Sequence, residues 1–122
     1  MKYKIMREID WEKVKKIKKT KKNDNQIYVN KYFKNKSVFG NNCIFIKCKF
    51  GRGCEFGSCC KFESRCEFRS YCSFGEYCSF GECCNFESDC KFGSYCDFEI
   101  GCKFESGCIK NKPYWENGVR IE

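Results

Sequence analysis

Three residue types are missing from the 122-residue chain, which has no histidine, no alanine and no leucine. A helical bundle draws its core from leucine and its helix propensity from alanine, so the absence of both argues against that class. Without histidine there is no imidazole base, no Ser-His or Cys-His nucleophile and no histidine-ligated metal. The missing types therefore argue against a helical fold and against histidine-dependent catalysis.

Fourteen cysteines would be typical of a secreted disulfide scaffold, but their context opposes that interpretation. The first residues contain no apolar run long enough for a signal peptide. No stretch approaches the roughly 20 apolar residues that span a membrane. The cysteines are also evenly spaced, whereas disulfide frameworks have uneven loops. We therefore expect a cytoplasmic protein whose reduced thiols act as small apolar core residues.

Most of the cysteines belong to a six-residue repeat, Cys-x-Phe-x-x-x, that runs unbroken from Cys48. Twelve of the fourteen are in phase, and only Cys59 and Cys83 are not. Before Cys48, the pair Cys43 and Phe45 fits after a one-residue deletion. Further back, the repeat predicts inward residues at Phe39, Phe33 and Ile27, with Ser37, Lys31 and Asn25 in place of cysteine. A fixed period of this kind is typical of a solenoid.

Each repeat reads as one short strand followed by a bend. Cys and Phe stand two residues apart, so in an extended segment both side chains point to the same side. The residue after Phe is Gly or Glu in nine of ten regular units, which suits a solvated corner. Stacked coils would pair the strands in parallel at about 4.8 Å. The repeat therefore predicts an all-β parallel β-helix with inward Cys–Phe pairs.

The hexad Phe74-Gly75-Glu76-Tyr77-Cys78-Ser79 resembles the unit of the hexapeptide-repeat family, with Phe for its aliphatic residue and Cys for its small one. The resemblance covers about residues 25–110 and implies a left-handed, triangular β-helix with three hexads per coil. Familiar members are trimeric acyltransferases, and relatives include zinc carbonic anhydrases. Both activities depend on histidine, so the resemblance carries over the fold and neither activity.

Columns of like residues distinguish two coil lengths. At a spacing of 18 residues, Gly57, Gly75 and Gly93 stack. At a spacing of 24 residues, Cys59 matches Cys83 instead. We favour the 18-residue coil, and a four-sided 24-residue coil is the alternative.

The repeat divides the chain into a basic N-terminal segment (1–24), the solenoid (25–110) and a C-terminal cap (111–122). At Lys110 a charged residue replaces Phe, and the single proline follows at Pro113. Residues 114–121 predict a hairpin around Asn117-Gly118 whose aromatic residues cover the last coil. At the other end, Asp10 is expected to cap a short basic helix over residues 11–21.

The basic character of the chain belongs to its N-terminal third. Residues 1–47 carry 14 Lys or Arg and four acidic residues, whereas residues 48–122 carry ten and twelve. The helix over 11–21 would place Trp11, Val14 and Ile17 on one face, where they could cap the first coil. The lysines are either solvated or bind an anionic partner through their strong local field. The candidate partner-binding residues are Lys13, Lys15, Lys16, Lys18, Lys19, Lys21 and Lys22.

No arrangement of residues predicts a catalytic site, a cofactor or a metal site. A tetrahedral zinc site needs four convergent ligands, which a straight ladder of cysteines does not offer. Cys59 and Cys83 fall on an outward position and are the candidate reactive thiols. Tyr71, Tyr77 and Tyr95 share that position and are candidate surface contacts with a partner, a second subunit or the N-terminal helix.

These features favour a non-enzymatic binding protein, a rigid solenoid whose basic arm docks on a protein, a nucleoprotein or a nucleic acid. Small size and a Lys/Asn/Ile-rich composition suit a phage or mobile-element inhibitor, similar to an anti-CRISPR protein, of a nucleic-acid-handling host complex. The alternative is a structural solenoid that self-assembles without such a partner, as a dimer or trimer. A third hypothesis is an atypical metal- or thiol-based protein.

Overall fold

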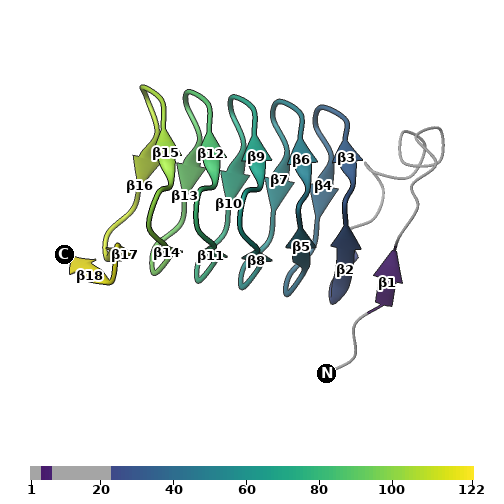
Figure 1. Cartoon of the computed structure of the whole chain (residues 1–122), viewed down its shortest axis with the longest axis horizontal. Coiled ribbons are helices and arrows are strands. Elements are labelled where there is room, and N and C mark those ends of the chain that lie inside the picture. Colours follow the sequence, from purple (N-terminus) through teal and green to yellow (C-terminus); the bar gives the residue numbers. More distant parts are fainter. Residues whose placement is uncertain (1–3, 7–22) are drawn as a thin grey trace.

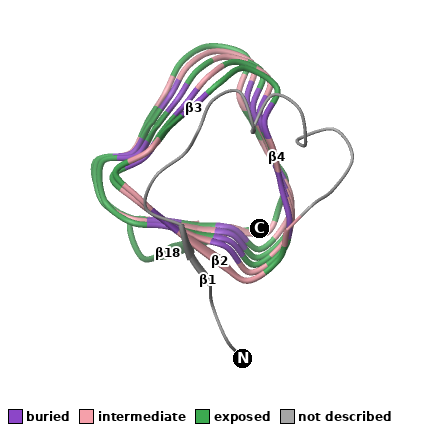
Figure 2. Ribbon diagram, turned by 90° about the vertical axis from the view of Figure 1, so that its right-hand side faces the viewer, coloured by how far each residue is buried: buried purple, intermediate pink, exposed green. Residues whose placement is uncertain are grey.

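Each hexad folds into a two-residue strand and a bend, and the strands stack into a parallel β-solenoid (Figure 1). The computed structural model describes residues 4–6 and 23–122. Viewed along the axis, the strands lie on three sides of a triangular section (Figure 2). The helix expected over residues 11–21 lies outside the described residues. The prediction of an all-β parallel solenoid is confirmed.

Three sheets form the sides of the solenoid. Sheet A holds β1 (Lys4–Met6), β2 (Gln26–Val29), β5 (Ile44–Ile46), β8 (Lys61–Phe62), β11 (Ser79–Phe80), β14 (Asp97–Phe98), β17 (Tyr114–Glu116) and β18 (Val119–Ile121). Sheet B holds β3 (Tyr32–Phe33), β6 (Lys49–Phe50), β9 (Glu67–Phe68), β12 (Asn85–Phe86) and β15 (Lys103–Phe104). Sheet C holds β4 (Val38–Phe39), β7 (Glu55–Phe56), β10 (Ser73–Phe74), β13 (Lys91–Phe92) and β16 (Ile109–Lys110). Strand β1, which pairs in parallel with β2, is an element that the repeat did not predict.

The strand register establishes the length of the coil. Phe56 pairs with Phe74, and Phe74 pairs with Phe92, which defines an 18-residue coil. The prediction of an 18-residue coil is confirmed, and the 24-residue alternative is wrong. A run of three hexads closes a coil because each side of the triangle takes one strand.

The first two coils, from Tyr28 to Phe45 and from Phe45 to Phe62, are each one residue shorter than the later ones. The shortening of the first coil corrects one predicted position. Tyr28 pairs with Phe45 in the register, and its side chain is buried, whereas that of Ile27 is only half-buried. The prediction that Ile27 points inward is therefore wrong. The cause is a second shortened bend: Tyr28 and Phe33 stand five residues apart, as Phe45 and Phe50 do at the same corner. Gln26 and not Asn25 consequently takes the position of the cysteine.

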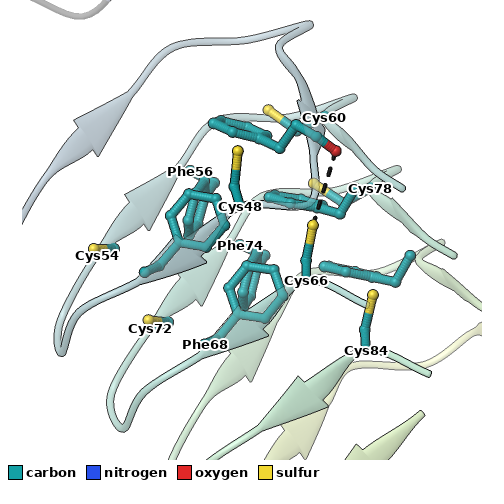
Figure 3. Packing of buried hydrophobic residues seen from close by; sticks show 14 of the residues in the cluster. Cys48, Cys54, Phe56, Cys60, Cys66, Phe68, Cys72, Phe74, Cys78 and Cys84 are labelled. Atoms are coloured by element: carbon teal, nitrogen blue, oxygen red, sulfur yellow. Dashed lines mark hydrogen bonds between the residues drawn. The ribbon is translucent and has the colours of Figure 1, made fainter. Parts of the chain in front are cut away.

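The core is a continuous stack of phenyl rings (Figure 3). Within one sheet, rings of successive coils lie parallel, as for Phe56 and Phe74, whose centroids are 4.8 Å apart at an interplanar angle of 3°. Between sheets the rings meet edge to face, as for Phe56 and Phe62 at 5.0 Å and 87°. Aromatic pairs in such geometries contribute about 0.5–1.5 kcal/mol each beyond burial of their area. The phenyl rings thus connect successive coils within each sheet and also connect the three sheets with one another.

The inward cysteines fill the corners of the triangle and satisfy backbone groups there. Each of the twelve thiols donates a hydrogen bond to a carbonyl of the preceding coil, as from Cys72 to Gly51 at 3.3 Å. The bond from Cys66 to the Phe45 carbonyl at 3.8 Å is the dashed line in Figure 3. A buried carbonyl without a partner is costly. At Ser37, which replaces a cysteine, the hydroxyl donates to the Lys34 carbonyl at 2.7 Å. A small side chain that donates a hydrogen bond therefore suits this corner.

The bends depend on left-handed backbone conformations just before each inward cysteine. This residue has a positive φ at every bend of the solenoid, including 61° at Cys59 and 62° at Tyr77. For a residue other than glycine this conformation costs about 1 kcal/mol or more. Its N–H is held by the next coil, as between Cys59 and the Glu76 carbonyl at 2.9 Å. The backbone hydrogen bonds between successive coils thus offset the strain of the left-handed residues.

Glycines line one corner, between sheets C and A, and successive coils approach closely there, as they also do at Gly51 and Gly81 at the other two corners. A Cβ atom at Gly75 would lie 2.8 Å from the backbone carbonyl carbon of Gly57 and from the nitrogen of Ser58. Gly40, Gly57 and Gly93 occupy the same column and are equally crowded. The stacking of Gly57, Gly75 and Gly93 expected for an 18-residue coil is confirmed.

The C-terminal end closes with a hairpin and an ion pair. Strands β17 and β18 pair antiparallel across Asn117-Gly118, as predicted. The register places Lys110 after Phe92 and Glu116 after Phe98, so two charged residues continue the inward Phe columns. The Lys110 ammonium lies 4.2 Å from the Phe104 ring centroid and 2.5 Å from the Glu116 carboxylate. Inward-pointing charges of this kind discourage edge-to-edge pairing.

The crowded glycine corner generates a stability prediction. Gly75→Ala should lower the free energy of unfolding by about 1–3 kcal/mol, because the new Cβ forces two coils apart. Equilibrium urea unfolding measures it. Glu63→Ala is the matched control, since Glu63 holds the same hexad position at another corner and already has a Cβ. Equal stability of the two variants would contradict the close-approach argument.

The charged end generates a second prediction. The double variant Lys110→Phe/Glu116→Phe restores apolar residues to both columns, so it should associate end to end with rising concentration. Light scattering coupled to size-exclusion chromatography, at 0.5 M salt to screen other charges, measures the mass. Lys112→Phe, at an exposed neighbouring position, should keep the mass of the unmodified chain. Unchanged mass in the double variant would show that the ion pair does not terminate stacking.

Candidate anion-binding face

The outer surface of sheet B, with the bends on either side of it, carries most of the charge of the solenoid. We call it the sheet B side; it comprises residues 29–37, 46–54, 63–72, 81–90 and 99–108, one range from each of coils 1 to 5. Because Cys and Phe take the inward positions, the remaining positions of each hexad face solvent. A groove of about 1060 Å³ runs along this side over β3, β6, β9, β12 and β15.

The first two coils form a basic half of this side. They carry six cationic residues and no acidic residue: Lys31, Lys34, Lys36, Lys47, Lys49 and Arg52. Five are exposed, whereas Lys31 takes the position of an inward cysteine and is half-buried. Two exposed tyrosines accompany them, Tyr32 in coil 1 and Tyr71 in coil 3. The Arg52 guanidinium lies 5.5 Å from the Tyr71 ring centroid, a cation–π geometry.

Ion pairs cross the groove between coils. Lys49 and Glu67 approach to 3.6 Å, and Arg69 and Glu87 approach to 3.9 Å. All four side chains are well exposed, so each pair contributes little to stability. A hydrogen bond with Tyr32 and the charge of Glu67 raise the pKa of Lys49. Lys49 therefore stays fully charged at neutral pH.

The last two coils form an acidic half of the same side. Coil 3 is balanced, with Arg65 and Arg69 against Glu63 and Glu67. Coil 4 carries three acidic residues and no cation: Glu82, Glu87 and Asp89. Coil 5 carries Glu99 and Glu105 against Lys103. The sheet B side is consequently bipolar along the axis.

The lysines singled out from the sequence lie outside the described residues. These are Lys13, Lys15, Lys16, Lys18, Lys19, Lys21 and Lys22. The basic half begins nine residues after the last of them, at Lys31. The described chain therefore continues the basic N-terminal character onto one face of the solenoid.

The three candidate tyrosines are exposed but do not form one surface. Tyr77 and Tyr95 stack at the corner between sheets C and A, with ring centroids 4.8 Å apart and planes within 4°. Trp115 extends this row, 6.4 Å from Tyr95. Tyr71 lies at the corner between sheets B and C, beside the groove. Only Tyr71 therefore adjoins the charged side.

Cys59 and Cys83 are the two exposed thiols among fourteen free cysteines. They lie at different corners, Cys59 in the column of Tyr77 and Cys83 on the sheet B side. The inward thiols differ from these two in being buried or half-buried. At Cys48, burial raises the pKa to about 11 and keeps that thiol protonated. A protonated thiol donates hydrogen bonds and is a poor nucleophile.

Two other kinds of site are absent from the described part of the chain. Among residues 4–6 and 23–122, no group of three or more cysteine or acidic side chains could hold a metal ion. Over the same residues, no helix has the length and apolarity to cross a membrane.

Two comparisons with known proteins found no match. No protein-family model matches it, and no curated protein sequence matches it. The parallel solenoid with 18-residue coils and three sheets therefore rests on the geometry of the chain itself.

Sequence reasoning missed the bipolar side, although the signal is present. Counting charges separately for residues 1–47 and 48–122 gives a basic part and a nearly neutral part. This count hides how the charge changes from coil to coil along the solenoid. Wrapping the sequence into 18-residue coils, with one residue fewer in each of the first two, would have placed Lys47 and Arg52 on the same side as Glu82 and Asp89. The missing information was which hexads share a side.

The burial of the thiols generates a prediction. In the folded protein, Ellman's reagent should react rapidly with about two thiols, because only Cys59 and Cys83 are exposed. The remaining thiols should react in urea. Cys59→Ser/Cys83→Ser should abolish the rapid phase, and Cys72→Ser serves as a buried control that leaves it intact. Rapid reaction of many thiols in the folded chain would contradict the packed ladder.

Proposed function

We propose that the protein is a non-enzymatic binding protein that docks on an anionic macromolecular partner through the basic half of the sheet B side and the basic segment 1–24. The observation that carries this proposal is the set of six cations without an acidic residue on the sheet B side of two adjacent coils. Neighbouring coils are about 4.8 Å apart, so cations at equivalent positions of the two coils lie within one Debye length of each other. Their potentials therefore add.

Rigidity and aromatic neighbours support a docking role. Every coil is tied to the next by backbone hydrogen bonds and stacked rings, so the basic side chains project from a fixed frame. Tyr32 is 60% exposed and Tyr71 is 57% exposed, and tyrosine is enriched at binding hot spots. A preorganised surface loses less entropy on binding than a flexible one.

As the partner we propose a nucleic-acid-handling complex in the cytoplasm, blocked in the manner of a phage or mobile-element inhibitor. The support is the small size, the composition and the basic surface. We propose no catalytic role and no cofactor, because the chain has no histidine to serve as the base or ligand that related folds use.

We further propose that the coil is left-handed, as in the hexapeptide-repeat family. The six-residue period, the 18-residue coil and the three parallel sheets support this assignment. Phe and Cys would then be the local versions of that family's aliphatic and small residues.

The docking role is tested with fluorescently labelled single-stranded DNA and RNA, and with the partner captured from the native host. Lys47→Glu/Arg52→Glu should weaken binding at least tenfold and lower the slope of log affinity against log salt by about two, since two cations are removed. The control Lys91→Glu/Lys112→Glu changes the same charge on the sheet C side and should bind almost normally.

The arm is tested separately. Lys15→Glu/Lys16→Glu/Lys18→Glu/Lys19→Glu should also weaken binding and its salt dependence. Binding that survives both sets of charge reversals would overturn the proposal. Concentration-dependent assembly that survives deletion of residues 1–22, without any anionic partner, would favour the structural alternative.

A further inference from the structure

The charge of the sheet B side changes sign along the axis in a regular way. Coils 1 and 2 each carry three cations, coil 3 is neutral, coil 4 carries three acidic residues and coil 5 has one net negative charge. Coil 3 is the middle coil, so the pattern is nearly antisymmetric about it.

The other two sides do not share this gradient. In the ranges 38–45, 55–62, 73–80, 91–98 and 109–116, each coil has a net charge of one or zero. On those sides most charges are balanced within the coil, as Glu55 is by Lys61 and Lys91 is by Asp97. The polarity of the rod is therefore a property of the sheet B side.

We infer that the sheet B side is a self-complementary surface that binds a second copy of this chain, antiparallel and related by a twofold axis. The axis lies in the interface, parallel to β9 of coil 3. Such an axis reverses the order of the coils and keeps each corner opposite its own counterpart. Coil 1 then faces coil 5 of the partner, and coil 2 faces coil 4. An isologous contact of this kind is the commonest way in which soluble chains dimerise.

Opposite charges meet at both corners in this arrangement. At the corner between sheets A and B, Lys47 of coil 2 faces Glu82 of coil 4 in the second copy. At the corner between sheets B and C, Arg52 faces Asp89 in the same way. Twofold symmetry repeats both contacts, which makes four pairs. The same residues in a parallel arrangement would oppose like charges.

The middle coil fits the same symmetry. Arg69 and Glu67 lie two residues apart in coil 3, so the arginine of one copy can reach the glutamate of the other. Arg65 and Glu63 repeat this relation at the other corner. Tyr71, exposed beside the groove, faces its own counterpart. Each copy thus finds a polar or aromatic partner at the centre of the contact.

The area of the face sets the strength of the contact. Four coil spacings of about 4.8 Å and one hexad of about 20 Å give a flat area of roughly 400 Å² per copy. Stable dimers bury about 800 Å² per partner. The pair is therefore weak and reversible, and because exposed charges supply its attraction, it dissociates as salt rises.

Self-association and anion binding share the basic half. Where the proposed function holds, each copy covers the site of the other, so an anionic partner has to displace the second copy; this consequence alone rests on the proposed function. The acidic half then acts as a competitor for the basic half.

Charge-swap variants test the pairing. Sedimentation equilibrium should show dimers of the unmodified chain at 20 mM salt and monomers at 0.5 M. Lys47→Glu/Arg52→Glu and Glu82→Lys/Asp89→Lys should each weaken dimerisation at least tenfold, because like charges then meet at both corners. Mixed in equal amounts, the two variants should form a heterodimer. In that pair, the residues at positions 47 and 52 of each copy again face residues of opposite charge at positions 82 and 89 of the other. Lys91→Glu/Lys112→Glu, on the sheet C side, should dimerise normally.

Failure of the self-association inference and failure of the proposed function give different experimental results. Monomers of the unmodified chain at all salt concentrations, or a mixture of swap variants that does not dimerise, would overturn the self-complementary surface. Binding of labelled nucleic acid reports on the proposed function independently, because Glu82→Lys/Asp89→Lys keeps the basic half and should bind at least as tightly as the unmodified chain. Circular dichroism and urea unfolding confirm that each variant is folded.

Discussion

The structure depends on one repeated contact, the in-register stacking of an inward phenyl ring on the ring of the next coil. Rings such as Phe56 and Phe74 lie 4.8 Å apart and nearly parallel, which matches the spacing of paired strands. Because ring and backbone repeats coincide, every coil has the same radius, and the corners are left with space for one small residue. Cysteine fills that space and also donates to the carbonyl beneath it, as Cys72 does to Gly51. Stacked rings and satisfied corners together explain how two-residue strands form a stable sheet.

A regular core places every outward position on a lattice, and this links the fold to the candidate site. Residues at one hexad position recur on the same side every third hexad, so a charge pattern along the chain becomes a charge pattern along a face. The basic half and the acidic half arise in this way, from Lys47 and Arg52 in coil 2 and Glu82 and Asp89 in coil 4. Few of these charges touch the core, so they can vary without disturbing it. The solenoid separates the residues that determine folding from those available for binding.

Periodicity alone predicted the solenoid, the 18-residue coil, the stacked glycines and the terminal hairpin, because each follows from spacing or from turn chemistry. The periodicity wrongly placed Ile27 inward, because a shortened bend puts Tyr28 in that position instead. The site of a single deletion cannot be located from one weakly matching repeat. Strand β1 was also missed, because Lys4–Met6 lies outside the repeat and owes its pairing to β2. The candidate thiols could be predicted from phase, whereas the bipolar side required knowledge of which hexads share a sheet.

Charged residues also determine how the C-terminal end of the core is closed. At the C-terminus, Lys110 and Glu116 take inward positions and neutralise each other, so the Phe columns end in a polar layer instead of an exposed ring. End-to-end growth of the parallel sheets is thereby discouraged. Of the three long sides, only the sheet B side has charges of both signs separated along the axis. A surface of this kind favours partners that are anionic or that repeat its own pattern in reverse, and a second copy of the chain meets the second condition by symmetry.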